Sequence, residues 1–340
     1  MSNDYIIYRI VIGSRYFTTP KFYAEGEISK FTTLFPEEKI KILESAKSFQ
    51  INFIEELGQV ISVIVKGTNY TQALRESETK FDESLDILSK DFYSYIKCEI
   101  SEAGIIKNLE SLEIHTIKRE DYNFNQSREA IGSVFETKAN EFEKPNIYQL
   151  IYEFKHRNIV KAFLRSIHYY RLAKKESNII YKFLSYWMSF EAISRTTKED
   201  NIKQKLLFSL NIFTGKKYKN LNQTILKKMS VHPDFKLISK IVKKSIPTLI
   251  STRNSIVHNG FNANDINNQE IRKYCILLHF GISRLQNLCK ESIIDNDINL
   301  SNFWEKIEIY FNRIEKINTY FENTGYPYLK GTQIYNNLNF

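Results

Sequence analysis

Short runs of apolar, β-branched and aromatic residues punctuate the first third of the chain, as is typical of strands. Three such runs cover residues 5–12, 60–65 and 112–117, and the first two are closed by Gly13 and Gly67. Because each run is short and bounded by turn residues, we expect a strand at each place.

Between these runs the apolar residues take the spacing of helices. Pro36 and the two glutamates after it predict a helix that closes at Gly58, because acidic side chains favour the positive end of a helix. A second, long amphipathic helix is predicted by spacings of three, four and seven residues between Leu74, Phe81, Leu85, Leu88, Phe92 and Tyr95. Together these elements predict an α+β domain over residues 1–120, with residues 121–149 as a connection.

Helical patterns replace the strand signals in the second half of the chain. They cover residues 147–173, 177–195, 199–212, 220–230, 234–258, 268–291 and 301–321. Within 234–258, Ser245 suits a helix N-cap and Pro247 suits a first turn, which predicts two helices that meet there. We therefore expect an all-α bundle over residues 150–295, a C-terminal helix and tail over 296–340, and a chain that is predominantly helical.

Composition narrows the class of protein. Of the 340 residues, 42% are hydrophobic and 26% are charged, a mixture that can bury a core over a length that favours two domains. No run of about 18 apolar residues is present, which argues against a membrane-spanning helix, and the first residues lack the basic start of a signal peptide. The three cysteines are widely spaced without a CxxC pair, so we expect no disulfide framework, no metal site and a cytoplasmic location.

Charge is unevenly distributed along the chain. The net charge is +9, yet residues 51–150 hold 11 Lys and Arg against 18 Asp and Glu, whereas residues 151–250 hold 21 against 6. An excess of this size is typical of a surface that meets a polyanion. The alternative is lysine enrichment through an AT-rich genome, since Lys, Asn, Ile, Tyr and Phe are all abundant.

The most informative segment is residues 245–260. Arg253 interrupts an apolar stripe, and a cation on an inward face is costly unless it is paired or opens into a cleft. The residues of this stripe are Leu249, Ile250, Ile256 and Val257. Asn254 and His258 are four residues apart and share a face, and Asn259-Gly260 is a strong C-cap that puts His258 in the last turn.

Arg253 and His258 are five residues apart, which is about 140° around an ideal helix. The two side chains can line one groove, but they cannot easily hold a single phosphate between them. A second copy of the helix, related by a two-fold axis, would bring two arginines and two histidines around one cleft. If this pair does chemistry, we expect a homodimer.

The pattern Arg-Asn-x-x-x-His at 253–258 resembles the signature of the HEPN superfamily of helical domains. Upstream, a helix with the paired aromatics Tyr169-Tyr170 precedes one that reads Phe-Leu-x-x-Trp-x-x-x-Glu-Ala over 183–192. This order is similar to that of the ApeA-like branch of HEPN proteins, which is found in bacterial anti-phage defence. The resemblance covers about residues 150–292 and does not reach the N-terminal domain.

The resemblance implies a HEPN-type bundle and a metal-independent endoribonuclease without a cofactor, which cleaves cellular or phage RNA such as tRNA as a toxin or defence enzyme. The ribose 2′-hydroxyl would attack the adjacent phosphate, leaving a cyclic phosphate and a free 5′-hydroxyl. Arg253 and His258 would be catalytic, with Asn254 and Glu191 in support. These residue types suit the reaction, because histidine titrates near working pH and arginine offers a planar fork of donors to the developing charge.

The lysine-rich stretch over residues 201–250 is the expected RNA-binding surface, since it holds 11 lysines and a single acidic residue. Its candidate contacts are Lys216, Lys217, Lys219, Lys227, Lys228, Lys243 and Lys244. A solvated lysine face is the alternative. The N-terminal domain, judged from architecture alone, would sense a phage-derived or regulatory protein trigger or hold the nuclease inactive.

Several residues keep a second interpretation. Glu191 would either hold Arg253 in a cleft or form an intrahelical pair with Arg195, four residues on. Arg253 and His258 could instead be a buried arginine bonded to carbonyls and a C-capping histidine.

The tyrosines Tyr169 and Tyr170 are expected in the core, with stacking on an unpaired base as the alternative. Two rival functions also stay open at this point: a non-catalytic HEPN module that binds RNA or a protein, and a helical DNA-binding regulator. No clear helix-turn-helix spacing supports the regulator.

Overall fold

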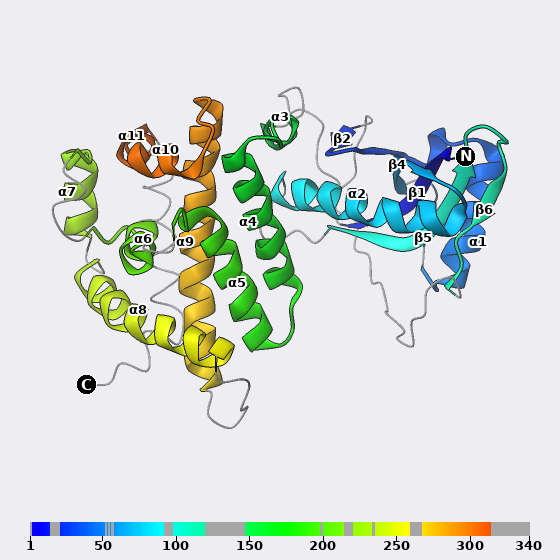
Figure 1. The fold of residues 1–340 in the computed structure, drawn as a ribbon. Coiled ribbons are helices and arrows are strands. Elements are labelled where there is room, and N and C mark those ends of the chain that lie inside the picture. The colour runs from blue at the N-terminus through cyan, green and yellow to red at the C-terminus, as the bar shows by residue number, and fades with distance from the viewer. Residues whose placement is uncertain are drawn as a thin grey trace. The chain divides into compact units, whose positions relative to one another are not determined.

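The computed structural model describes residues 2–13, 21–51, 53, 55, 58–91, 98–119, 147–197, 200–213, 220–232, 235–258 and 267–313 (Figure 1). The chain divides into two compact units, Met1–Glu153 and Phe154–Phe340. The first unit combines an antiparallel sheet with helices, and the described part of the second is helical. The expected order of an α+β part followed by a helical part is confirmed. None of the described helices has the length and apolar character needed to cross a membrane.

The first unit is built on one six-stranded sheet with the order β2-β3-β4-β1-β5-β6. Its strands are β1 (Asn3–Gly13), β2 (Lys21–Tyr23), β3 (Gly26–Lys30), β4 (Gln59–Gly67), β5 (Cys98–Asn108) and β6 (Ile114–Thr116), and all neighbours are antiparallel. The strands predicted at 5–12, 60–65 and 112–117 are confirmed as β1, β4 and β6. The sequence analysis did not predict β2, β3 or β5.

Helices cover both faces of this sheet. Ile42 of α1 (Pro36–Ser48) joins the apolar cluster around Ile10 of β1. Arg9, the neighbour of Ile10 on the opposite face, is ion-paired with Glu78 of α2 (Tyr70–Asp91) and lies 4.6 Å from the Phe81 ring. Arg9 and Ile10, two consecutive residues of β1, are therefore both buried, where a sheet with one wet face would bury alternate ones.

One helix prediction in this unit is wrong at its C-terminal end, and another extends beyond the described residues. The helix predicted to run from Pro36 to Gly58 ends at Ser48, because Gln50 adopts a φ of 57°, which an α-helix cannot continue through. The long amphipathic helix is confirmed as α2 up to Asp91, and Phe92 and Tyr95 lie outside the described residues.

The second unit is organised around three helices that lie side by side: α4 (Asn158–Lys175), α5 (Ile179–Ser194) and α9 (Asn268–Ile294) (Figure 1). A buried polar network joins them. Gln286 Nε2 donates to Ser166 Oγ at 2.9 Å, and Ser189 Oγ donates to the Ser166 carbonyl at 2.7 Å. Because each buried group finds a partner, the network fixes the relative position of the three helices at little desolvation cost.

Six further α-helices belong to the described structure. They are α3 (Ile147–Glu153), α6 (Ile202–Ser209), α7 (Gln223–Val231), α8 (Phe235–His258), α10 (Leu300–Glu305) and α11 (Ile307–Arg313). The single helical pattern predicted over 147–173 is divided between α3 and α4. Helix α3 belongs to the first unit, where the Gln149 side chain accepts from Ala24 N at 2.6 Å and donates to Ala24 O at 3.1 Å.

The prediction of two helices meeting at Ser245-Ile246-Pro247 is wrong. Helix α8 runs without interruption from Phe235 to His258, with Pro247 inside it. A proline in a helix removes one N–H donor and frees the carbonyl four residues earlier. Pro247 is exposed, so the carbonyl of Lys243 can be solvated and the helix continues.

Gly104 in β5 lies where β1 and β5 change register, between Arg9 and Val11. A Cβ atom at this glycine would stand 1.8 Å from the carbonyl oxygen of Tyr8, so no side chain fits. The Gly104 N–H donates to Ser45 Oγ at 2.8 Å, and that hydroxyl donates to the Ile117 carbonyl at 2.5 Å. The two hydrogen bonds of Ser45 hold α1 against the sheet.

Replacing Gly104 by alanine should therefore destabilise the first unit by roughly 1–3 kcal/mol, because strand β5 must move away from β1 to accommodate the methyl group. Urea denaturation followed by circular dichroism measures the change. Glu99→Ala, at an exposed position of the same strand, is the matched control and should change stability by less than about 0.5 kcal/mol. Equal stability of Gly104→Ala and the wild type would contradict the close approach.

Candidate functional site

Helix α8 has one buried and one exposed face. Six apolar side chains line the buried face: Ile238, Ile241, Val242, Ile246, Leu249 and Ile256. Ten of its exposed positions recur every three or four residues and are occupied by Lys236, Lys240, Lys243, Lys244, Pro247, Thr248, Ser251, Asn254, Ser255 and His258. We call these ten residues the α8 face. It carries lysines in its N-terminal half and Asn254 and His258 in its C-terminal half.

The predicted apolar stripe of α8 is correct at Leu249 and Ile256, which are buried, and Ile250 is half-buried. It is wrong at Val257, whose side chain is 50% exposed. Val257 lies directly before the helix terminus at His258.

Arg253 is half-buried beside α5. Its Nη2 lies 3.4 Å from Glu191 Oε2, and each of the two side chains is 19% exposed. Its Nη1 donates to Asn254 Oδ1 at 3.1 Å, and its guanidinium carbon lies 5.6 Å from the centre of the buried Trp187 ring. An ion pair, a neighbouring amide and an aromatic ring together offset the cost of placing a cation on this side of the helix.

Glu191 is shared between two arginines. Oε1 of this carboxylate lies 3.3 Å from Nη2 of Arg195, the C-cap residue of α5, while Oε2 faces Arg253. Both interactions that the sequence left as alternatives are present at once, because a carboxylate has two acceptor oxygens.

Two nitrogen donors at the contact between Arg253 and Trp187 have no hydrogen-bond partner in the described part of the chain. They are Nε of Arg253 and Nε1 of Trp187. Buried donors without an acceptor are uncommon in folded proteins, and a water molecule or an anion would satisfy them.

His258 ends α8 and is exposed to solvent. The predicted cap at Asn259-Gly260 lies outside the described residues. Asn254 contacts Arg253 through its Oδ1, so its acceptor oxygen is directed to the guanidinium. The structure therefore brings Glu191, Arg253 and Asn254 together, while His258 lies about 140° further round the helix from Arg253.

The predicted RNA contacts lie partly within the described residues. Lys227, Lys228, Lys243 and Lys244 are exposed on α7 and α8, and Lys216, Lys217 and Lys219 lie outside the described residues. One other lysine of the basic stretch has a structural role. Lys205 is buried, donates to the Ser194 carbonyl at 2.5 Å and pairs with Asp200 at 3.0 Å.

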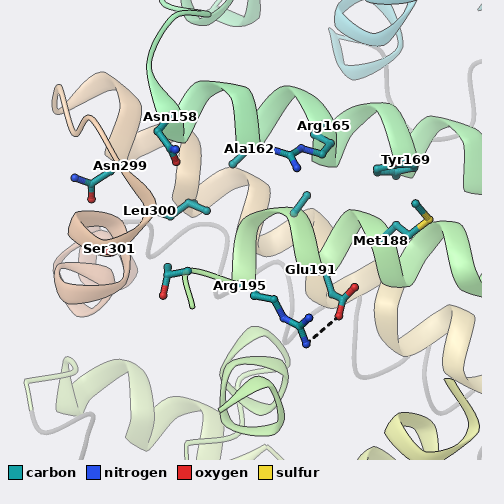
Figure 2. Close-up of a pocket in the computed structure, with 12 residues that line it drawn as sticks. Asn158, Ala162, Arg165, Tyr169, Met188, Glu191, Arg195, Asn299, Leu300 and Ser301 are labelled. Atoms are coloured by element: carbon teal, nitrogen blue, oxygen red, sulfur yellow. Dashed lines mark ion pairs between the residues drawn. The ribbon is translucent and has the colours of Figure 1, made fainter. Parts of the chain in front are cut away.

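A groove of about 610 Å³ lies beside Glu191, between α4, α5 and the start of α10 (Figure 2). Its lining consists of Asn158, Ala162, Arg165, Tyr169, Met188, Glu191, Ala192, Arg195, Thr196, Asn299, Leu300 and Ser301. Arg253, Asn254 and His258 do not line it. The sequence analysis did not predict this groove. The spacing of four between Arg165 and Tyr169 on α4 was one available signal, because it puts both side chains on one face.

Cysteine and metal chemistry find little support among the described residues. Burial raises the pKa of Cys275 to about 12 and also raises the pKa of Cys289, so both thiols stay protonated and weakly nucleophilic near neutral pH. Within the described ranges, no group of three or more His, Cys, Asp or Glu side chains is arranged to hold a metal ion.

Comparison of the chain with protein-family models, with characterised proteins and with solved structures finds no match.

The two ion pairs of Glu191 should differ in strength. In double-mutant cycles with Glu191→Gln, we expect a coupling energy of about 1 kcal/mol with Arg253→Gln, because both partners are largely buried. The coupling with Arg195→Gln should stay below about 0.5 kcal/mol, because Arg195 is 47% exposed and lies on the same helix. Urea unfolding of the single and double variants measures both energies. A larger coupling for Arg195 than for Arg253 would contradict this order, and a coupling near zero for Arg253 would show that this carboxylate does not hold it.

Proposed function

We propose that this chain is an endoribonuclease whose reaction site is formed by Arg253 and His258 of α8, with Glu191 and Asn254 as positioning residues. The observation that supports the proposal most strongly is the placement of Arg253. Its guanidinium is tethered by Glu191 at 3.4 Å and by Asn254 at 3.1 Å, and its side chain keeps 19% of its surface exposed. A preoriented, permanently charged fork suits a phosphate in its transition state.

The proposed reaction is an internal transesterification of RNA. The ribose 2′-oxygen forms a bond to phosphorus, the bond from phosphorus to the 5′-oxygen breaks, and the products are a 2′,3′-cyclic phosphate and a 5′-hydroxyl. A base takes the proton from the 2′-hydroxyl, and an acid delivers one to the leaving 5′-oxygen. Histidine suits either step, because it exchanges a proton near neutral pH.

A homodimer forms part of the proposal. Arg253 and His258 point about 140° apart around one helix, so one copy of α8 presents them in different directions. The reaction also needs a base and an acid on opposite sides of phosphorus. A two-fold arrangement would let His258 of one protomer act beside Arg253 of its partner.

The α8 face gives the RNA a route to this site. Its lysines precede Asn254 and His258 along the same exposed side of the helix, from Lys236 onward. Because lysines attract the phosphate backbone without reading its sequence, they would guide a strand towards the helix terminus.

The biological role proposed here rests on the resemblance of residues 150–292 to HEPN proteins of the ApeA-like branch. It is the cleavage of cellular or phage RNA, such as tRNA, in anti-phage defence, with the first unit receiving a phage-derived or regulatory signal. The reaction would need neither a metal ion nor a cofactor.

A second candidate function is a HEPN module that binds RNA or a protein without cleaving it. One observation favours it: Arg253 is already engaged by Glu191, while His258 is exposed on a different side of the helix. In such a module the arginine would contact phosphate and the histidine would have no role in a reaction.

Cleavage of RNA in the presence of excess chelator distinguishes the two functions. The purified full chain should produce new 2′,3′-cyclic phosphate and 5′-hydroxyl ends in total RNA, detected by end-specific ligation and sequencing. His258→Ala and Arg253→Ala should each lower the rate by about 100-fold or more while RNA binding is retained.

Matched controls for this experiment are His156→Ala and Arg272→Ala, both at exposed positions outside the proposed site. They should cleave at the wild-type rate. Intact RNA with the wild-type protein, or equal cleavage by His258→Ala, would favour the binding module, and a strict need for a divalent metal would contradict the proposed mechanism.

The lysines of the α8 face should contribute to binding through phosphate contacts. In a titration of single-stranded RNA against salt, Lys243→Ala/Lys244→Ala should lower the slope of log K against log[salt] by about 1.4, since each phosphate contact contributes about 0.7. The control pair Lys161→Ala/Lys175→Ala, exposed on α4, removes the same charge and should leave the slope nearly unchanged. Equal slopes for both pairs would indicate a diffuse effect of net charge.

A further inference from the structure

The groove beside Glu191 is walled by three segments that are distant in the sequence. Residues of α4 and α5 form two sides, and Asn299, Leu300 and Ser301 at the start of α10 close one end (Figure 2). Its volume of about 610 Å³ lies within the range of small-ligand sites in proteins. A groove of this size accepts one nucleotide, whereas a duplex is far too wide.

The charge of the groove favours an anion. Arg165 on α4 is exposed and has no ion-pair partner among the described residues, and Arg195 on α5 keeps 47% of its side chain exposed. Among the described residues that line the groove, Glu191 is the only acidic one, and it already faces two guanidiniums, Arg195 and Arg253. Guanidinium groups on two walls of one groove are suited to holding a phosphate group between them.

The rest of the lining favours an aromatic base. Tyr169 is half-buried, with the His168 ring 5.5 Å away in an edge-on contact that restrains it. Met188, 41% exposed, offers a polarisable thioether from α5. Aromatic rings stack on any nucleobase, and methionine adapts to different shapes. The small side chains of Ala162 and Ala192 leave space between the two helices.

Tyr169 and Tyr170 are neighbours in α4, but they differ in burial. Tyr170 is 5% exposed, and its hydroxyl is hydrogen-bonded to His279 Nδ1 at 2.9 Å. The expectation of a core position is therefore confirmed for Tyr170, while Tyr169 lines the groove.

We infer that this groove binds one unpaired nucleotide of a single-stranded RNA, with its phosphate between Arg165 and Arg195 and its base against Tyr169 and Met188. This inference rests on the proposed function, and it names the substrate class as RNA that is unpaired next to the cleaved bond. The link is Glu191, which lines the groove and holds Arg253 at 3.4 Å. A strand whose phosphate reaches Arg253 therefore passes the mouth of the groove.

The test is a thermodynamic cycle on binding, which needs no cleavage. His258→Ala protein is titrated with a single-stranded oligoribonucleotide and with a set of the same oligonucleotides carrying one abasic site at successive positions. Tyr169→Leu should weaken binding of the intact strand by roughly 5- to 100-fold, the range for one stacked base. It should change the affinity by less than about two-fold for the oligonucleotide whose missing base is the one that occupies the groove.

Conservative and matched variants separate stacking from a merely structural effect. Tyr169→Phe keeps the ring and should bind like the parent protein, and Tyr181→Leu, which removes an exposed tyrosine of α5 outside the groove, should too. Arg165→Gln should lower the salt slope by about 0.7, whereas Lys161→Gln, one turn earlier on α4, should not. Fully paired RNA should bind equally to the parent and to Tyr169→Leu.

Equal weakening of all oligonucleotides by Tyr169→Leu, or none, would overturn the inference, as would unchanged binding in Arg165→Gln. If Tyr169→Leu fails to fold, Arg165→Gln and Met188→Ala supply the same cycle from more exposed positions. The two proposals fail separately: RNA that is bound through the groove but never cleaved rejects the ribonuclease, and RNA that is cleaved without any dependence on Tyr169 rejects the groove.

Discussion

A single carboxylate with two guanidinium partners constrains the candidate site. Glu191 is 19% exposed, and a charge so poorly hydrated is costly unless it is neutralised. Arg195 supplies one countercharge from the same helix and Arg253 supplies the other from α8, so that the carboxylate ties α8 to α5. The Trp187 ring, one turn before Glu191, adds an aromatic surface near the same guanidinium. The direction of Arg253 is thus set by α5 as much as by its own helix.

This arrangement depends on a rigid support for α5. The hydrogen bonds among Ser166, Ser189 and Gln286 tie α4 to both α5 and α9 inside the core. Buried polar groups constrain register more than apolar contacts do, because a shifted helix would leave a donor or an acceptor without a partner. A shift of α5 would move Trp187 and Glu191 together, and the guanidinium of Arg253 would move with them.

Much of the fold was predictable because it depends on local periodicity. The pattern of α2 and the β-branched runs of β1 and β4 identify their elements within a few residues. Predictions failed where contacts between residues distant in the sequence determine the local structure. Strand β5 contains both polar and apolar residues, and it depends on Gly104, which lets β1 approach. Pro247 is tolerated within α8 because its position on the helix faces solvent. The two partners of Glu191 were both foreseen, but sequence spacing cannot say that they coexist. The groove could not be foreseen, because Asn299 and Leu300 reach it from more than a hundred residues beyond α5 in the sequence.

The same carboxylate would also couple the groove to the proposed reaction site. Arg195 faces Glu191 and lines the groove, so an anion that draws Arg195 away leaves the full charge of Glu191 to Arg253. The attraction between Glu191 and Arg253 would then strengthen, and Arg253 would be held more firmly while RNA occupies the groove. With an empty groove, Glu191 divides its charge between Arg195 and Arg253. A site built in this way would be most ordered when an unpaired nucleotide is in place, which offers a physical route to discriminating single-stranded from paired RNA without reading any base.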